Sequence, residues 1–283
     1  MVEESLPPLR EVIESHGLNA KKSLGQHFLL DLNITRKIVR QLPIQENDSV
    51  IEIGPGPGGL TRALLETGCQ LTVIERDKRC IEALANLNSY FDDKLTIVEG
   101  DALGADEASL IKKHGNEQDA WIVSNLPYNI STELLIKWLK ASPRWWRGMA
   151  LMFQKEVADR ISAVHGNKTY GRLSVISQSV CEVSKGFDLP ARAFTPPPKV
   201  DSTVLVFAPK VDIPCDILAL EKITAAAFSQ RRKMLRTSLN AVLGDRTESI
   251  LEDAQLESTV RAEQVSVSQY QQVTRIFCSL KEQ

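Results

Sequence analysis

Val50-Ile51-Glu52-Ile53-Gly54-Pro55-Gly56 is the stretch that decides the fold of this 283-residue chain. The residues up to Ile53 read as a buried strand. The Gly-Pro-Gly that follows predicts a turn whose backbone can pass close to a ligand, because glycine has no side chain. Together with Gly59, the two glycines nominally fit the pattern G-x-G-x-x-G. That pattern alone is weak evidence for a nucleotide site, so its surroundings decide what it means.

Short apolar runs alternate with amphipathic stretches from about residue 48 to 153. Strands are expected at 49–53, 70–75, 94–98, 119–124 and 148–153, and helices at 59–67, 78–89, 106–114 and 131–140, after a first helix at 33–42. Alternation at this spacing predicts an α/β fold, an open parallel sheet with helices on both faces. Ligands of such sheets bind beyond the carboxyl ends of the strands, where the strand order reverses.

Candidate functional groups follow the ends of four predicted strands: Gly54, Glu75, Asp101 and Asn125. Strand ends of a parallel sheet meet at one edge, so these groups should converge on one rim. The Glu75 carboxylate can bind both ribose hydroxyls of an adenosine, and Asp101 can accept a hydrogen bond from an adenine amine. Each of these acids, taken singly, can also be a solvated strand end.

A carboxylate on a ribose serves NAD and S-adenosylmethionine sites alike, so Glu75 does not choose between them. Glu52 lies two positions before the first glycine, and Pro55 and Pro57 stiffen the turn. Both features favour S-adenosylmethionine, because a dinucleotide fold presents a helix N-terminus to the pyrophosphate.

The tetrapeptide Asn125-Leu126-Pro127-Tyr128 follows the apolar run 120–123. It suits a flat base with an exocyclic amine. The Asn125 side-chain oxygen and the Leu126 carbonyl can accept both amine hydrogens, while Tyr128 stacks on the ring. An ordinary strand-ending turn is the alternative, since Asn and Pro are both common in turns.

Composition narrows the class of protein. Apolar residues make up 43% of the chain and charged residues 25%, as in ordinary globular proteins. No apolar run approaches the 18 residues of a membrane span, and the N-terminus does not look like a secretory signal. The five cysteines never show C-x-x-C spacing. We therefore expect reduced thiols in a cytoplasmic protein, no metal site and, without a coiled-coil pattern, a monomer.

The net charge of −2 neither supports nor excludes a nucleic-acid partner, because the distribution of charge matters more than its sum. Basic residues gather in three places: Lys21-Lys22, Arg144 with Arg147, and Arg231-Arg232-Lys233 with Arg236. The pair Trp145-Trp146 is expected to be partly buried packing.

The second half of the chain changes character. Residues 154–180 read as helix with a break at 165–167, followed by strands at 181–187 and 202–208 around the loop 194–199. Helices near 216–228, 231–242, 247–253 and 267–280 come next. We therefore expect a catalytic domain of residues 1–210 and a small all-helical domain of residues 211–283.

The motifs form an ordered set along nearly the whole chain. They are Gly25-Gln26-His27-Phe28-Leu29, Glu52-Ile53-Gly54-Pro55-Gly56 with Leu60-Thr61, Val73-Ile74-Glu75, Gly100-Asp101-Ala102, Asn125 to Ser131, Phe153 to Val157, Tyr170 to Val175, Phe194 to Ser202 and Phe228 to Lys233. This set resembles the ribosomal small-subunit rRNA adenine dimethyltransferase family, called KsgA in bacteria. The chain departs from the family at His27, where many members have Asn, and in a more glycine-rich turn at 57–59.

The resemblance implies a Rossmann-like S-adenosylmethionine-dependent methyltransferase sheet and a role for each matching residue. Gln26, His27 and Leu29 would flank the cofactor, Gly54 and Gly56 would pass beneath its methionine part, Glu75 would hold the ribose, Asp101 the adenine amine, and Asn125 would border both cofactor and target. Asn125 and the Leu126 carbonyl would accept from the target amine, with Tyr128 stacked on the base and Phe194 packed on it from another side. Arg231, Arg232, Lys233 and Arg236 would bind RNA phosphates, although they can also be a solvated helix face.

The implied activity is dimethylation of two adjacent adenosines near the 3′ end of small-subunit rRNA, within an assembling 30S particle. A large-subunit methyltransferase of the macrolide-resistance type shares the cofactor site, but the 194–199 loop and the 228–233 cluster favour the small-subunit enzyme. A ribosome-assembly factor that acts mainly by binding is an alternative of another class, and an NAD-dependent dehydrogenase is a remote one.

Overall fold

The structure is a computed structural model that describes residues 6–18, 26–113 and 119–280, without the side chain of residue 113. The basic pair Lys21-Lys22 and Gly25 of the first motif lie outside the described residues. The chain divides into two compact units. The first consists of Met1–Lys155 with Lys185–Phe207, and the second of Glu156–Ser184 with Ala208–Gln283.

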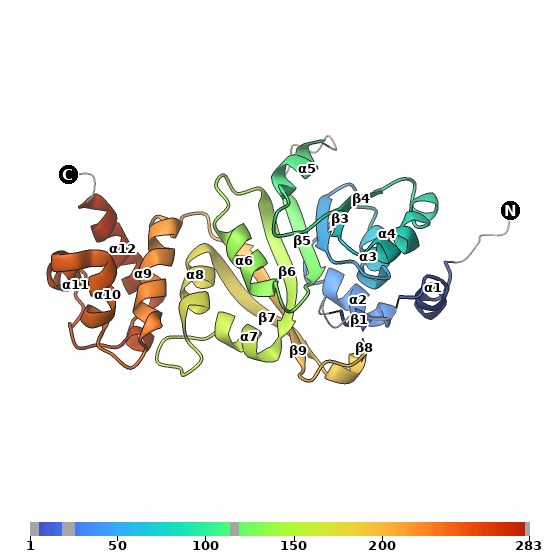
Figure 1. The fold of residues 1–283 in the computed structure, drawn as a ribbon. Helices are drawn as coiled ribbons and strands as arrows, with labels where there is room; N and C mark the ends of the chain where they lie inside the picture. The colour runs from blue at the N-terminus through green and yellow to red at the C-terminus, as the bar shows by residue number, and fades with distance from the viewer. Residues whose placement is uncertain (1–5, 19–25, 114–118, 281–283) are drawn as a thin grey trace. The chain divides into compact units, whose positions relative to one another are not determined.

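A seven-stranded sheet in the order β4-β3-β2-β5-β6-β9-β7 organises the fold (Figure 1). Its strands are β2 (Ser49–Ile53), β3 (Gln70–Glu75), β4 (Leu95–Glu99), β5 (Ala120–Asn125), β6 (Trp146–Gln154), β7 (Cys181–Leu189) and β9 (Ser202–Pro209). The pairs from β4 to β6 are all parallel, whereas β9 runs antiparallel to β6. The expected α/β fold is therefore confirmed, and the strand order reverses between β2 and β5, next to the glycine turn.

The helices of the first unit are α1 (Leu9–Ser15), α2 (Leu32–Val39), α3 (Gly59–Leu65), α4 (Lys78–Ala85), α5 (Glu107–Lys113) and α6 (Ser131–Leu139). Helices α2, α3 and α4 lie on one side of the strands and α6 on the other (Figure 1). Asp31 and Asp77 begin α2 and α4, where their carboxylates accept from the backbone N–H groups two residues further on.

The main core fills the space between the sheet and α2 to α4. Val50 and Val73 of the strands pack there with Leu60 and Leu64 of α3, and all four are almost fully buried. All five residues of β2 are buried, so both faces of this strand are covered, and Glu52 is the one charged residue among them.

Two short strands outside the main sheet bring distant segments together. β1 (Phe28–Leu29) pairs antiparallel with β8 (Phe194–Thr195), and Leu29 lies opposite Phe194. A short helix, η3 (Ala191–Ala193), precedes β8. The loop expected at 194–199 is therefore attached to the Gln-His-Phe-Leu motif.

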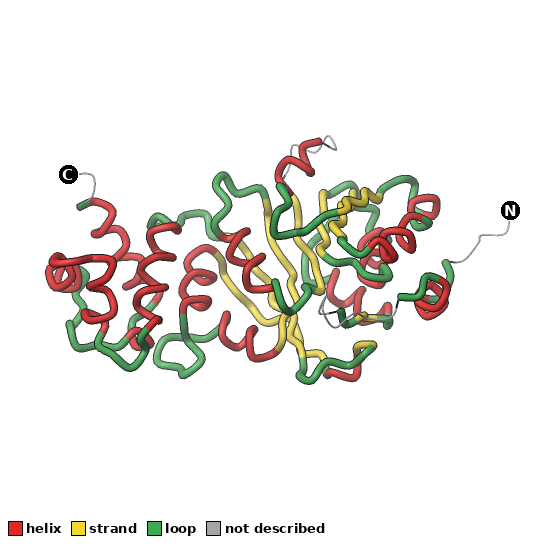
Figure 2. The backbone as a smooth tube through the Cα atoms, in the orientation of Figure 1, coloured by secondary structure: helices red, strands yellow, loops and turns green. Residues whose placement is uncertain are grey.

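The second unit is helical apart from the strand residues at its edges, as Figure 2 shows for the chain after β9. It contains most of α7 (Lys155–Ile161), together with α8 (Arg172–Val180), α9 (Ile217–Ser229), α10 (Leu235–Leu243), α11 (Thr247–Asp253) and α12 (Val267–Ser279).

The second unit differs from the expected domain 211–283 by taking in residues 156–184. The cause is packing, because Tyr170 and Val175 are buried in one cluster with Leu220 and Ile223 of α9. The chain enters this unit for good at Ala208, close to the expected boundary near 210. No helix among the described residues has the length and apolar character that crossing a membrane requires.

The helix expected at 231–242 begins later, at Leu235. Arg231 to Lys233 form the turn between α9 and α10, in which the Lys233 N–H donates to the Gln230 carbonyl. Met234 is extended and forms a bridge with Arg261, which keeps these residues out of the helix.

Candidate active site

One pocket of the first unit opens at the carboxyl ends of β2, β3, β4 and β5. Its lining includes Gln26, His27, Leu29, Gly54, Gly56, Glu75, Asp101, Asn125, Leu126 and Tyr128. These are all the residues that the sequence assigned to the cofactor and the target base, apart from Phe194. The structure thus brings together groups that lie up to about a hundred positions apart in the chain.

The glycine turn forms the floor of this pocket. Gly54 and Gly56 have φ values of +64° and +57°, which favour glycine. A Cβ on Gly54 would lie 3.2 Å from Cγ of Pro127, and one on Gly56 would lie 3.0 Å from the Phe28 ring. A side chain at either position would therefore crowd Pro127 or Phe28, both of which line the pocket.

Glu75 presents a preorganised carboxylate at the end of β3. The side chain is buried, and its Oε1 accepts from the N–H groups of Arg76 at 2.8 Å and Asp77 at 2.9 Å. Its Oε2 accepts from Gly56 at 3.3 Å. Burial raises the pKa of this carboxyl, and the three backbone donors oppose that shift. A carboxylate fixed in this way suits the two hydroxyls of a ribose.

Glu52 is a second buried carboxyl group in the lining, to which the sequence gave no role of its own. Thr61 Oγ1 donates to its Oε2 at 2.7 Å. Burial is the main cause that raises the pKa of Glu52 to about 8, and the nearby Glu75 adds to the shift. At neutral pH Glu52 is therefore mainly a neutral acid, which can donate as well as accept. Its position two residues before the first glycine was the available signal.

Asp101 lies on the loop after β4, with an exposed side chain that accepts from the Leu103 N–H at 3.0 Å. The loop is tied down by Lys137 of α6, a residue that the sequence did not suggest. Its Nζ donates to the carbonyls of Ala102 at 2.8 Å and Ala105 at 2.6 Å, and it pairs with the buried Glu107 at 2.9 Å.

The Gln-His-Phe-Leu segment forms another wall. Gln26 Nε2 donates to Asp77 Oδ2 at 3.4 Å. His27 Nδ1 lies 2.8 Å from the Pro196 carbonyl, and its ring lies 5.5 Å from that of Tyr128. These contacts hold the His27 ring beside that of Tyr128 in the lining of the pocket.

Asn125 is oriented by the backbone of this same segment. Its Nδ2 donates to the His27 carbonyl at 3.0 Å. Because the amide nitrogen is used in this bond within the protein, Oδ1 stays available to accept a hydrogen bond from a ligand amine. Among the described residues, no donor reaches that oxygen.

Tyr128 is half-buried three residues further on. Its hydroxyl lies 2.6 Å from Ser202 Oγ, a bond that fixes the ring from its far end. Burial raises the pKa of the phenol, so the hydroxyl stays neutral at physiological pH. A fixed aromatic ring beside an amide acceptor is the arrangement that a stacked base requires.

The role predicted for Phe194 does not fit its place in the structure. The ring is 2% exposed and belongs to the main core, and Phe194 does not line the pocket. Its pairing with Leu29 turns it inward, so it supports the wall of the site and is not available to stack on a base.

The four basic residues predicted to bind RNA lie on the second unit and are exposed. Arg231 Nη2 donates to the carbonyls of Lys168 and Tyr170, which gives it a structural task. Arg236 pairs with Glu248 at 3.3 Å. The side chains of Arg232 and Lys233 are exposed to solvent.

The two residues of the pair Trp145-Trp146 differ in burial. Trp145 is partly buried, whereas Trp146 is fully buried and its indole N–H donates to the Trp138 carbonyl.

The pocket fits S-adenosylmethionine on two observations of the structure. Glycine at positions 54 and 56 leaves the floor without side chains, and the buried Glu75 carboxylate lies beside that floor, where it accepts from the Gly56 N–H. Fold and site together define a Rossmann-like, S-adenosylmethionine-dependent methyltransferase.

Comparisons with known proteins narrow this class. Residues 17–279 match the sequence model of the family described as ribosomal RNA adenine dimethylase. The chain therefore belongs to the ribosomal RNA adenine dimethylase family, and it is an enzyme that methylates with S-adenosylmethionine.

Individual relatives agree with this assignment. The chain is 51% identical over 280 residues to the ribosomal RNA small subunit methyltransferase A of Maricaulis maris, covering 97% of this chain and 96% of the relative. It is 53% identical over 267 residues to the protein of the same name from Phenylobacterium zucineum, covering 94% and 90%.

Solved structures resemble the chain over most of its length. A dimethyladenosine transferase from Plasmodium falciparum superposes with a TM-score of 0.77 at 27% identity, covering 89% of this chain and 98% of that one. The 23S rRNA methyltransferase ErmE superposes with a TM-score of 0.65 at 23% identity, covering 89% and 99%. The second likeness concerns the fold alone.

Proposed function

We propose that the protein transfers methyl groups to the exocyclic amines of two adjacent adenosines near the 3′ end of small-subunit (16S) rRNA, within an assembling 30S particle. The observation that carries the proposal is the orientation of Asn125, whose Nδ2 is occupied by the His27 carbonyl so that Oδ1 can accept from an amine. The names of the curated relatives support the small subunit as the substrate rather than the large one.

The chemistry asks little of acids and bases. When bound, S-adenosylmethionine supplies a methyl group that its sulfonium already activates. The residues of the protein hold the adenine amine. This amine is a poor nucleophile because its lone pair is delocalised into the ring. Acceptance of both amine hydrogens by Asn125 Oδ1 and the Leu126 carbonyl favours a pyramidal nitrogen with its lone pair directed at the methyl group.

Positioning supplies the remaining catalysis. Tyr128, fixed by Ser202, would hold the base in the plane that the two acceptors require. Orientation of this kind lowers barriers by up to about 7–11 kcal/mol in favourable systems. The base must first leave its stack, at a cost of a few kcal/mol.

We assign RNA binding by the second unit to the exposed heads of Arg232 and Lys233, with Arg236. Arg231 contributes through the shape of the turn, since its guanidinium is bonded to two backbone carbonyls. The monomeric state and the cytoplasmic location expected from the sequence stay predictions.

The test incubates the protein with labelled S-adenosylmethionine and small subunits from cells that lack this modification, followed by nuclease digestion and mass spectrometry. We expect dimethyladenosine at two neighbouring positions near the 3′ end. Transfer only to large-subunit RNA would support the macrolide-resistance type of enzyme. Cofactor binding without transfer to either RNA would favour an assembly factor.

A further inference from the structure

A second groove lies beside the catalytic pocket in the first unit. It is lined by the N-terminal segment and α1, by the start of α2, by α3 and by the chain around η3 and β8. Its charged side chains are Arg10, Asp31, Arg36, Arg62, Glu66 and Arg192. Nothing in the catalytic chemistry uses this groove.

The charge of the lining is positive. Four arginines face two carboxylates there, and one of each forms a bidentate pair, in which Arg36 donates to both oxygens of Glu66 at 2.7 Å. The remaining charged residues of the lining are Arg10, Arg62 and Arg192, which are positive, and Asp31, which is negative. Their net charge is +2. The Asp31 carboxylate is also engaged, because it caps the first turn of α2.

Arg62 gives the groove a buried positive charge. The residue is 4% exposed, its Nη1 donates to the Pro7 carbonyl at 2.7 Å, and its Nε has no hydrogen-bond partner. No carboxylate of the described residues pairs with it. A buried guanidinium without a counter-ion favours an anion nearby, since its charge is poorly screened by water.

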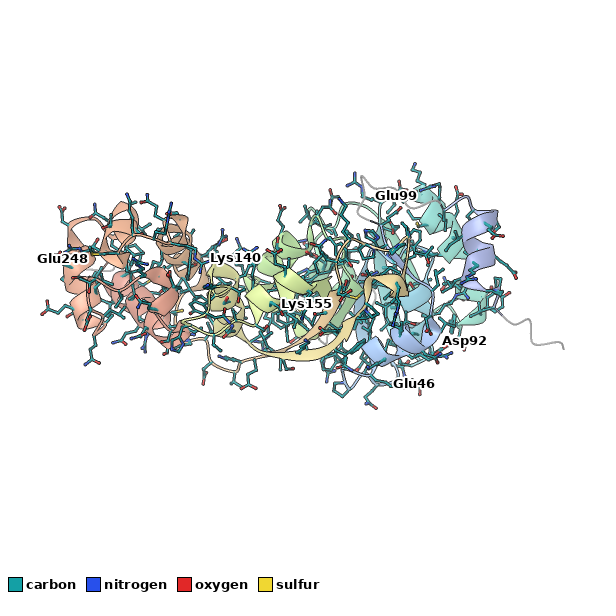
Figure 3. All side chains as sticks on the ribbon, turned by 90° about the horizontal axis from the view of Figure 1, so that it is seen from below. Glu46, Asp92, Glu99, Lys140, Lys155 and Glu248 are labelled. Carbon is teal, nitrogen blue, oxygen red and sulfur yellow. The ribbon has the colours of Figure 1, made fainter. Side chains whose placement is uncertain are left out.

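Arg10 and Arg192 flank this charge from two separate elements. Both are exposed, and neither forms an ion pair with a described carboxylate. The exposed acids labelled in Figure 3 on the first unit, Glu46, Asp92 and Glu99, do not line the groove. The groove therefore combines shape with unneutralised positive charge.

The groove and the catalytic pocket share one wall. That wall is the β1–β8 ladder with the residues that follow it: Leu29 lines the catalytic pocket, whereas Leu30 and Thr195 line the groove. In Figure 1, α2 lies close to this ladder.

We propose that this groove binds the phosphate backbone of the RNA next to the target adenosine. A base held in the catalytic pocket remains joined to its own backbone, so the neighbouring phosphates must pass over the surface beside the pocket. Arginine is well suited to phosphate, because its planar guanidinium donates in a fork. The proposal rests on the proposed function in taking the partner to be the substrate RNA.

The test compares an Arg10→Gln/Arg192→Gln double variant with wild-type protein and with Arg40→Gln, an exposed arginine at the end of α2 that does not line the groove. Arg62 is left intact because it also anchors the N-terminal segment. Two quantities are measured: binding of a 3′-terminal fragment of small-subunit rRNA at several salt concentrations, and the kinetics of methyl transfer to undermodified small subunits.

We expect the double variant to bind the RNA at least about tenfold more weakly and to raise the KM for the particle similarly, with kcat and the KM for S-adenosylmethionine unchanged. Two lost phosphate contacts should also reduce the slope of log affinity against log salt by about 1.4 to 1.8. Arg40→Gln should follow the wild type.

A double variant whose affinity and salt slope equal those of Arg40→Gln would overturn the proposal, whether or not methylation occurs. Wild-type protein that binds the RNA through these arginines but methylates no adenosine would instead contradict the proposed function. An equal loss in the double variant and in Arg40→Gln would show only diffuse attraction, and would also overturn the groove as a site.

Discussion

The side-chain amide of Asn125 is fixed by a carbonyl 98 positions earlier in the chain, and the proposed role of its Oδ1 as an acceptor depends on that bond. We expect Asn125→Ala to lower kcat for adenosine methylation by at least about 100-fold, because small losses of orientation have effects of that size. Single-turnover methylation of small subunits checks this. The matched control is Asn86→Ala, which alters an exposed asparagine outside the pocket. A variant that retained wild-type kcat would remove Asn125 from the catalytic residues.

The raised pKa of Glu52 predicts that the free energy of unfolding depends on pH. Its folded-state pKa of about 8 lies above the ordinary value of 4.5. The native state therefore holds this proton more tightly than the unfolded chain. Stability from this group is complete below about pH 4.5 and is lost as the pH rises towards 8. Glu52→Gln stays neutral throughout and can still accept from Thr61.

We therefore expect Glu52→Gln and wild type to be equally stable near pH 4.5, and the variant to become more stable by up to about 5 kcal/mol at pH 9. Urea unfolding at pH 5, 7 and 9 measures the difference. Glu82→Gln, which changes an exposed carboxylate, serves as the control and should show no such trend. A constant difference between Glu52→Gln and wild type across this range would mean that Glu52 is ionised in the native state.

At the scale of elements, Lys137 of α6 links the two halves of the site. It holds the loop that carries Asp101, and the helix that carries it begins directly after the Asn125 to Tyr128 segment. We expect Lys137→Met to weaken S-adenosylmethionine binding about tenfold and to lower the free energy of unfolding by about 1–3 kcal/mol, because the loop carbonyls lose their donor. Glu107 keeps the Trp138 indole N–H as a partner.

Calorimetric titration with S-adenosylmethionine and thermal unfolding test the Lys137 prediction together. Lys112→Met on the exposed side of α5 is the control and should change neither quantity. Lower stability with unchanged cofactor affinity would show that the loop keeps its shape without Lys137.

The elements predicted best from the sequence are those with a recognisable pattern in their own residues. The bounds of β2 and β3 agree with the structure because each is a short run rich in β-branched and apolar residues, followed by Gly54 in one case and closed by Glu75 in the other. β1 and β8 were not expected as strands, since two residues show no periodicity and form only through tertiary pairing. The same pairing turns Phe194 into the core, which its place in a proline-rich loop does not reveal. The Lys137 contacts likewise depend on α6 meeting the loop after β4.

At the scale of the whole molecule, the sequence indicated a change of character near residue 210 but not that the second unit is discontinuous. The sequence predicted helix with a break over 154–180, where the structure has α7 and α8 separated by residues 162–171, but it did not show which core buries these helices. Tyr170 and Val175 become part of the second core only because α9 and α12 return to cover α8. A break in composition therefore locates where the chain leaves the sheet, whereas the limits of a compact unit follow from packing.

This discontinuity makes a prediction about truncation. A chain that ends at residue 210 keeps α7 and α8 but loses Leu220, Ile223 and the other partners of Tyr170 and Val175 in the second core. We expect it to expose apolar surface, bind a hydrophobic dye strongly and aggregate at concentrations where the full chain does not. The comparison protein contains only the first unit. Residues 156–184 are replaced by a glycine-serine linker that joins Lys155 to Lys185, and the chain ends at Phe207. That chain should bind less dye, because the helices without partners are gone. A truncation at 210 that unfolds cooperatively without dye binding would show that α8 does not depend on α9 and α12.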